Sequence, residues 1–184
     1  MSIINLCSNR NLNSFVGLTQ LRNINIELIY SIKIKMGEKL THGFKLFQPW
    51  ASDVVKGKLN FLVRSIPTKK RERVAVIASR GIDDFWLNNA SDKEIEEKGD
   101  MKIGAIGSVE IKDCIEVGID KTKEKLIKLA GKKYWEYYPK YLIPNYTRAG
   151  RVYIWVLDKA KEWKKAKPVK GGGIVWTKLE MKDE

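Results

Sequence analysis

The order of strand-like and helix-like segments limits most strongly what this chain can form. Strand patterns outnumber helical ones, and they arrive irregularly, with helices between them. Clear strands are expected at 73–79, 103–117 and 151–160, and the apolar run RVAVIAS (73–79) is typical of a central strand. This order favours an α+β fold with a small curled sheet or barrel over a doubly wound parallel sheet.

Local capping signals predict where three helices begin or end. The segment WASDVVKG is expected to make about two helical turns, which Gly57 closes in the left-handed conformation. Ser91 and Glu94 fit a capping box at the start of another helix. Gly131 is expected to end a third helix, DKTKEKLIKLAG.

The N-terminal segment differs in composition from the rest of the chain. Its 36 residues are rich in Asn, Ile and Leu and poor in charge, whereas Met36 opens a stretch that reads like the beginning of a domain. The remaining length is enough for one domain with a proper core. We therefore predict an N-terminal extension at 1–36 and a single domain at 37–184, with natural translation from Met36 as an alternative explanation of the extension.

The chain carries a large excess of positive charge. It has 35 Lys and Arg against 22 Asp and Glu, a formal net charge of +13. Such an excess favours a polyanionic partner, although a basic surface that merely aids solubility is the alternative. No segment reaches the roughly 18 to 20 apolar residues that span a bilayer. The expected partner is therefore nucleic acid and not a membrane.

Cysteine and histidine are too few for a zinc site of the usual kind. The chain has Cys7 and Cys114, far apart in the sequence, and one histidine, His42. They form no CxxC pair, and free thiols fit a reducing, cytoplasmic setting. The sequence also contains no Gly-rich phosphate loop and no Gly-x-Ser-x-Gly elbow. We expect neither a metal ion nor another cofactor.

Several motifs follow one another in a recognisable order. They are QPWASDVVKG, VRSIPT, RVAVIAS, GAIGSVEIKDC and YIWVLDKA, the last followed by KPVKGGGIVW. From about Phe44 to Trp176 the chain resembles ASCH (activating-signal-cointegrator homology) domains, a branch of the PUA-like superfamily. This resemblance implies a small PUA-like β-barrel flanked by helices, with a cleft between the barrel and the first helix. ASCH relatives are proposed or known to bind RNA or DNA, and some hydrolyse an acylated cytidine or cleave RNA.

The chain departs from this pattern where the amidohydrolase members carry their catalytic groups. Glu110 falls in the strand that bears the catalytic glutamate of those members. The positions of their lysine and of a following polar residue are Leu59 and Leu62 here, and neither leucine can move a proton. Lys58 is adjacent, but strand alternation would turn it to the opposite face unless a bulge intervened. Lys58 and Glu110 are therefore catalytic candidates only if the protein is an enzyme, which this departure argues against.

Nine residues are predicted to contact nucleic acid. Arg64 is expected on the strand face away from the row Leu59, Phe61 and Val63, where it would fork onto phosphate or, alternatively, pair with Glu110. The run TKKRER (68–73) suits phosphate tracking or is an ordinary solvated loop, and the first tryptophan of the opening motif would stack on a base or anchor the first helix. The nine are Gln48, Trp50, Lys58, Arg64, Lys69, Lys70, Arg71, Arg73 and Lys170.

The sequence thus predicts a domain that binds RNA or single-stranded DNA in a basic cleft beside the barrel. One alternative is a hydrolase that acts on a modified nucleoside, similar to acylcytidine amidohydrolases, or a ribonuclease. Another is a domain that contacts proteins within a larger nucleic-acid assembly. The aromatic run at 134–146, interleaved with basic residues, suits stacking on a single strand or packing as a lid over the barrel.

Overall fold

Six strands form one sheet in the order β2-β5-β4-β3-β1-β6. The computed structural model describes residues 38–97, 101–137, 150–173 and 175–184. Lys39–Glu184 forms one compact unit, and the sheet belongs to it. The strands are β1 (Lys39–Gln48), β2 (Phe61–Arg64), β3 (Arg73–Ile82), β4 (Gly104–Gly118), β5 (Arg151–Lys167) and β6 (Thr177–Lys182).

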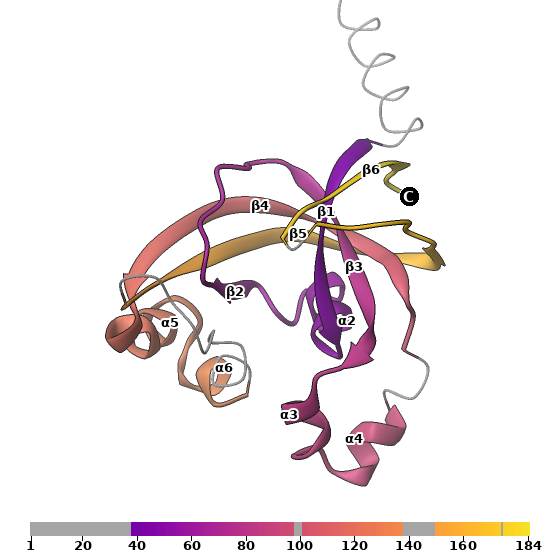
Figure 1. Cartoon of the computed structure of the whole chain (residues 1–184). Helices are drawn as coiled ribbons and strands as arrows, with labels where there is room; N and C mark the ends of the chain where they lie inside the picture. The colour runs from indigo at the N-terminus through magenta and orange to yellow at the C-terminus, as the bar shows by residue number, and fades with distance from the viewer. Residues whose placement is uncertain (1–37, 98–100, 138–149, 174) are drawn as a thin grey trace, which may run out of the picture. The chain divides into compact units, whose positions relative to one another are not determined.

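The sheet curls because its two longest strands are irregular. β1 and β3 pair in parallel, whereas the other neighbours pair antiparallel. The β4–β5 pairing shifts register between Ala105 and Gly107, between Ser108 and Glu110, and again near Asp113. Each such irregularity bends a strand and increases its twist. The result is the half-barrel of Figure 1, which confirms the predicted α+β class with a curled, barrel-like sheet flanked by helices.

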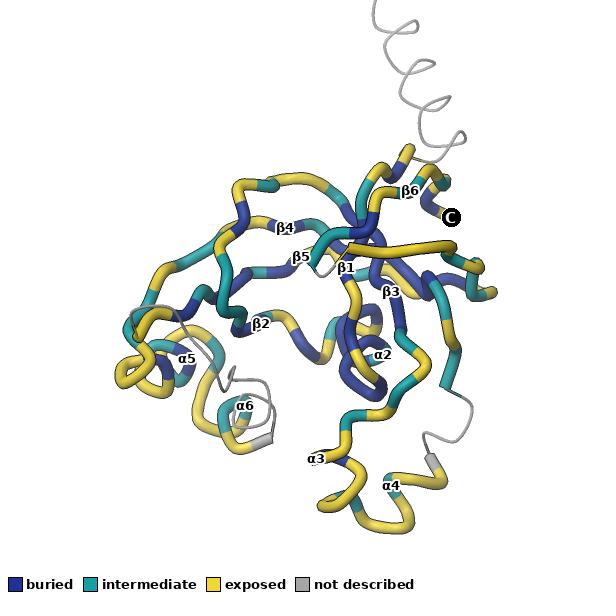
Figure 2. The backbone as a smooth tube through the Cα atoms, in the orientation of Figure 1, coloured by how far each residue is buried: buried dark blue, intermediate teal, exposed yellow. Residues whose placement is uncertain are grey.

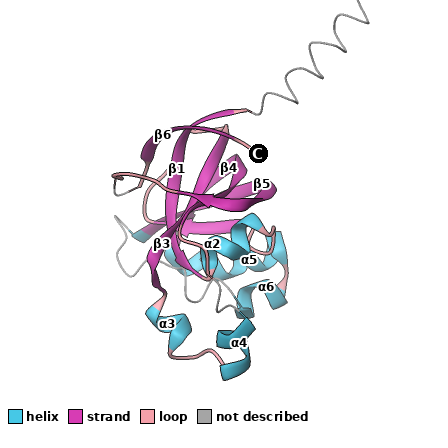
Figure 3. Ribbon diagram, turned by 90° about the vertical axis from the view of Figure 1, so that its right-hand side faces the viewer, coloured by secondary structure: helices cyan, strands magenta, loops and turns pink. Residues whose placement is uncertain are grey.

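Helix α2 packs against the sheet and is almost wholly buried (Figure 2). It contacts β1, β3, β4 and β5, and Figure 3 shows the strands above it. Gly107 allows this approach, because a Cβ atom there would lie 2.6 Å from Cγ1 of Val55. The helices are α2 (Trp50–Val55), α3 (Asp84–Leu87), α4 (Asp92–Glu97), the 3-10 turn η1 (Ile119–Lys121), α5 (Thr122–Ala130) and α6 (Lys132–Tyr137).

The predicted helix boundaries are confirmed. Gly57 follows α2 with a φ of +70°, and Gly131 follows α5 with a φ of +89°. At α4 the amide of Ser91 donates to Oε2 of Glu94 at 2.9 Å, and the amide of Glu94 donates to Oγ of Ser91 at 3.4 Å, which is the reciprocal capping box. Asp83 caps α3 by accepting from the Trp86 amide. These contacts are local, so sequence patterns identify them well.

Hydrophobic residues cover both faces of the sheet. Along β3, Val74 and Val76 belong to the cluster that α2 covers, whereas Ala75 and Ile77 belong to a cluster on the opposite face with Trp163. This alternation explains why the strand reads as a continuous apolar run, as the sequence predicted for a central strand.

The prediction that Leu59 shares one strand face with Phe61 and Val63 is wrong. β2 begins only at Phe61, and Leu59 lies in the preceding turn, where its amide donates to the carbonyl oxygen of Asp53. Leu59 is therefore buried with Leu62 in the cluster under α2, and not with Phe61 and Val63, which pack towards α5. Alternation could not apply because the strand had not yet begun.

Candidate functional site

Arg64 ends β2, and its side chain contacts residues of β5 and β1. Its guanidinium carbon lies 5.6 Å from the ring centroid of Trp155 on β5 and 6.0 Å from that of Phe44 on β1. One terminal nitrogen donates to the carbonyl oxygen of Lys45 at 3.2 Å. Guanidinium groups are attracted to aromatic faces at such distances. The side chain is thus held between two strands that are not neighbours in the sheet.

The charge of Arg64 is not neutralised by a carboxylate. The alternative pair with Glu110 does not form, and within the described ranges Arg64 makes no ion pair with any other carboxylate. Its Nε is buried and has no hydrogen-bond partner there. Burial lowers the pKa of Arg64 from its ordinary value to about 10, so the group stays charged at neutral pH. A buried polar atom without a partner is costly, which makes this arginine unusual.

A pair of stacked tryptophans lies beside Arg64. The rings of Trp155 and Trp176 are 5.2 Å apart and nearly parallel, at 9°. Phe44 meets both rings edge-on, and Nε1 of Trp155 donates to the carbonyl oxygen of Ile66 at 3.2 Å. Trp155 is fully buried, whereas Trp176 is partly exposed. The deeper ring therefore fixes the orientation of the more exposed one.

Lys70 adds a second positive charge to this group. Its Nζ lies 5.3 Å from the ring centroid of Trp176 and 3.0 Å from Oε1 of Glu72, which also lies 3.2 Å from Nδ1 of His42. An exposed pair of this kind is weak and can exchange its partner. We call Phe44, Arg64, Lys70, Trp155 and Trp176 the arginine–tryptophan cluster.

A second buried polar atom without a partner lies close by. Oγ1 of Thr177, a residue that is 2% exposed, has no hydrogen-bond partner in the described part of the chain. Thr177 pairs with Gly43 of β1, one residue before Phe44. Two unsatisfied polar atoms thus flank the same short stretch of β1.

Gln48 and Trp50 are integrated into the packing of α2. Nε2 of Gln48 donates to the carbonyl oxygen of Lys102 at 2.9 Å, and Oε1 accepts from the amide and hydroxyl of Ser52. Both residues are 2% exposed. Trp50 lies where the alternative interpretation put it, as the anchor of the first helix. Gln48 uses both its amide nitrogen and its amide oxygen in hydrogen bonds inside the protein.

The residues of the hydrolase alternative do not form a catalytic pair. Lys58 is exposed in the turn after α2, and Oε2 of Glu110 lies 2.6 Å from Nζ of Lys159. Glu110 stands opposite Arg73 in the β3–β4 ladder. Leu59 and Leu62, at 0% and 1% exposure, fill the core where the amidohydrolase pattern has polar groups. Catalysis by Lys58 and Glu110 stays an untested prediction that this geometry does not favour.

The remaining predicted cations are dispersed. Arg71 pairs with Asp113 at 3.1 Å, and Nε of Arg73 pairs with Asp183 at 3.0 Å. Lys69 and Lys170 are exposed. Of the basic run after β2, only Lys70 touches the arginine–tryptophan cluster. Trp155 and Trp176 were not among the residues predicted from the sequence. Both stand in motifs of the ASCH resemblance, and these motifs were the signal that could have identified them.

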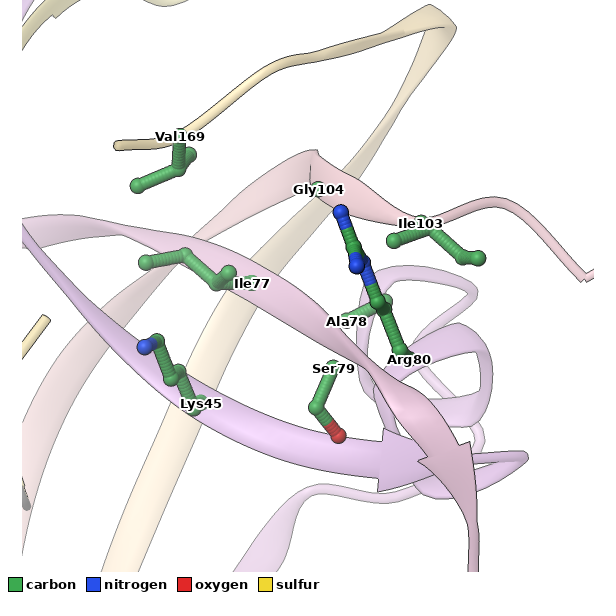
Figure 4. A pocket seen from close by; sticks show the side chains of 8 residues that line it. All are labelled: Lys45, Ile77, Ala78, Ser79, Arg80, Ile103, Gly104 and Val169. Atoms are coloured by element: carbon green, nitrogen blue, oxygen red, sulfur yellow. The ribbon is translucent and has the colours of Figure 1, made fainter. Parts of the chain in front are cut away.

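A separate pocket of about 210 Å³ opens between β1, β3 and the start of β4 (Figure 4). Its lining consists of Lys45, Ile77, Ala78, Ser79, Arg80, Ile103, Gly104 and Val169. None of the predicted site residues lines it. Most of the aromatic run at 134–146 lies outside the described residues; within it, the hydroxyl of Tyr134 bonds to the backbone of Phe61.

Two kinds of feature are absent from the residues that the structure describes. No helix there is long and apolar enough to cross a membrane. No group of three or more His, Cys, Asp and Glu side chains there is placed to hold a metal ion.

Comparisons with known proteins gave matches among solved structures. No family model and no curated protein matches the chain. It is similar to the crystal structure of ASCH from Zymomonas mobilis, with 12% identity, 75% of this chain and 86% of that chain covered, and a TM-score of 0.42. A mutant of that protein gives 14% identity, coverages of 75% and 87%, and a TM-score of 0.43. At these identities and TM-scores, the matches carry no conclusion about the fold, the site residues or the activity of this chain.

Proposed function

We propose that this domain binds RNA or single-stranded DNA at the arginine–tryptophan cluster. In this proposal a phosphate group contacts Arg64 and Lys70, and a base stacks on Trp176. The observation that carries the proposal is the guanidinium of Arg64, which is partly buried without a carboxylate partner among the described residues.

An external anion would complete the coordination of Arg64. The guanidinium has five N–H donors, and the hydrogen bond to Lys45 uses one. Arginine binds phosphate through two parallel hydrogen bonds, which are stronger than neutral ones. The net charge of +13 would attract a polyanion from a distance. A phosphate therefore suits this position better than a neutral ligand.

The tryptophan pair favours a strand with unpaired bases. Stacking of a base on an aromatic side chain contributes about 1–3 kcal/mol and requires that the base is not enclosed in a duplex. Trp176 is partly exposed and is supported from below by Trp155. Nζ of Lys70 lies 5.3 Å from the ring centroid of Trp176. A cation beside an aromatic ring is the combination found in proteins that bind single strands.

Fluorescence anisotropy with labelled single-stranded RNA, single-stranded DNA and duplex DNA tests the proposal, at low and at physiological salt. We expect both single strands to bind more tightly than the duplex, with affinity that falls as salt rises. Arg64→Met should weaken binding by roughly 10- to 100-fold, which corresponds to about 1.5–3 kcal/mol for hydrogen bonds to a charged group.

Lys128→Gln is the matched control. Lys128 is exposed on α5 and outside the cluster, and its replacement also removes one positive charge. Equal losses in the two variants would mean that binding reflects net charge alone and would overturn the proposed site. A denaturing gel after each titration reports on cleavage: an intact strand supports binding without hydrolysis, and a shortened one would favour the ribonuclease alternative.

A further inference from the structure

We infer that the pocket between β1, β3 and β4 is a second anion site, which takes a phosphate monoester carried on a sugar-sized group. This inference is independent of the strand binding proposed above, because none of the residues of the arginine–tryptophan cluster lines the pocket.

The charge of the lining favours a doubly negative ligand. Lys45 and Arg80 are cationic, and the lining contains no carboxylate. Nζ of Lys45 donates to the carbonyl oxygen of Gly171 at 3.3 Å, which leaves two of its three donors free for a ligand. Arg80 is exposed, and in the described residues it makes no ion pair. A phosphate monoester carries a charge of about −1.5 to −2 at pH 7, which matches two cations.

The two cations come from neighbouring strands and can reach one group. Lys45 stands beside Ile77 in the parallel β1–β3 ladder, and Arg80 follows three residues further along β3. At about 3.3 Å per residue this offset is roughly 10 Å, which two long flexible side chains can close from opposite ends. Figure 4 shows both side chains at the pocket, with the Arg80 guanidinium extending towards Gly104.

The rest of the lining would hold the carbon part of the ligand. Ile77, Ile103 and Val169 are apolar. The wall at Gly104 is tight, because a Cβ atom there would lie 2.5 Å from the carbonyl oxygen of Lys167, at a φ of +104°. The volume of about 210 Å³ is below the roughly 300 Å³ of pockets that enclose a whole drug-sized ligand. The pocket therefore fits a phosphate with its sugar and leaves a base outside.

Isothermal titration calorimetry of the full chain with adenosine 5′-monophosphate, adenosine and inorganic phosphate is the first test. We expect the monophosphate to bind, adenosine not to bind, and phosphate to bind more weakly. Arg80→Gln and, separately, Lys45→Gln should each weaken the monophosphate by about tenfold or more, within the range for charge-assisted hydrogen bonds. Lys128→Gln should leave it unchanged. Arg80 is exposed, so its variant is expected to fold, which circular dichroism checks.

The source of the monoester is decided by a second titration, with oligonucleotides that carry or lack a 5′-phosphate. A free nucleotide as ligand predicts monophosphate binding that depends on Arg80. The end of a strand as ligand predicts tighter binding of the phosphorylated oligonucleotide and loss of this preference in Arg80→Gln. The inference is wrong if the monophosphate does not bind and the 5′-phosphate does not change the affinity of the oligonucleotide. It is also wrong if Arg80→Gln changes neither the affinity for the monophosphate nor the preference for the 5′-phosphate. Arg64→Met, by contrast, should weaken strand binding and leave monophosphate binding intact.

Discussion

Two arginines on the same sheet have opposite surroundings. Nε of Arg73 lies 3.0 Å from Oδ2 of Asp183, and its terminal nitrogens donate to the carbonyl oxygen of Lys159 at 2.8 and 2.9 Å. Asp183 also accepts from Oγ of Ser108 at 2.7 Å and from Nε1 of Trp163 at 2.8 Å. Arg64 has two aromatic rings, one carbonyl oxygen and, among the described residues, no carboxylate.

The charge of Arg73 is used in the structure, whereas the charge of Arg64 is available to a ligand. At Arg73 the protein supplies the anion and satisfies it with further donors, so the network holds β3, β5 and the end of the chain together. At Arg64 the protein supplies rings that orient the guanidinium but no counter-charge. Such a group is better explained by a ligand than by stability, because an uncompensated buried charge costs free energy.

Removing the carboxylate at Arg73 should have the largest effect. Asp183→Asn leaves Arg73, whose side chain is 15% exposed, without its counter-ion. Breaking a buried pair from one side costs about 3–5 kcal/mol, and we expect a loss near 3 kcal/mol because the Lys159 carbonyl remains. Urea unfolding measures it. Asp158→Asn, at an exposed pair with Lys112, is the control and should cost much less. Equal small losses would contradict the comparison.

The pH dependence of stability should reveal the same carboxylate. Burial alone would raise the pKa of Asp183, but hydrogen bonds from Ser108, Trp163 and Arg73 outweigh it and lower the pKa below its ordinary value. A lowered pKa stabilises the folded state above the unfolded value of about 3.9 and loses this contribution as pH falls through the folded value.

Urea unfolding of the wild type and of Asp183→Asn, each at pH 7 and pH 3, checks this sign. The difference in free energy of unfolding between the two proteins should shrink at pH 3. Arg64 should contribute no such acid dependence, because it has no titrating partner in the described residues. A difference that grows on acidification would mean that Asp183 is bound in its protonated form.

The exposed tryptophan should matter for binding more than for folding. Trp176→Leu keeps an apolar side chain over Trp155 but removes the stacking surface, so we expect single-stranded RNA affinity to fall about tenfold. Phe85→Leu on α3 is the control, since Phe85 is an exposed aromatic residue outside the arginine–tryptophan cluster. Anisotropy titrations give both affinities. Unchanged affinity in Trp176→Leu would remove the base-stacking part of the proposal.

Sequence reasoning succeeded where the determining contacts are local. The caps at Gly57, Gly131 and Ser91–Glu94 depend on neighbours within a few residues, and the ASCH-like motifs indicated the curled sheet. The partner of Arg73 could not be found in this way, because Asp183 lies 110 residues away.

The same limit applies at the candidate site. The sequence offered Glu110 as a partner of Arg64, but strand register sets Glu110 opposite Arg73 and Asp158. The opening motif suggested Gln48 as a contact, yet the packing of α2 engages its amide with Ser52 and Lys102. The register between strands decides which of several lysines and arginines has no carboxylate partner. This register cannot be read from a single sequence.

The stability of Arg64→Met in the absence of nucleic acid tests the central claim most directly. Methionine fills similar space and removes the uncompensated charge, so the free energy of unfolding in urea should stay within about 1 kcal/mol of the wild type or rise. Binding of single-stranded RNA should weaken by roughly 10- to 100-fold in the same protein. A loss near 3 kcal/mol, as expected for Asp183→Asn, would show that Arg64 is as structural as Arg73 and would contradict the account.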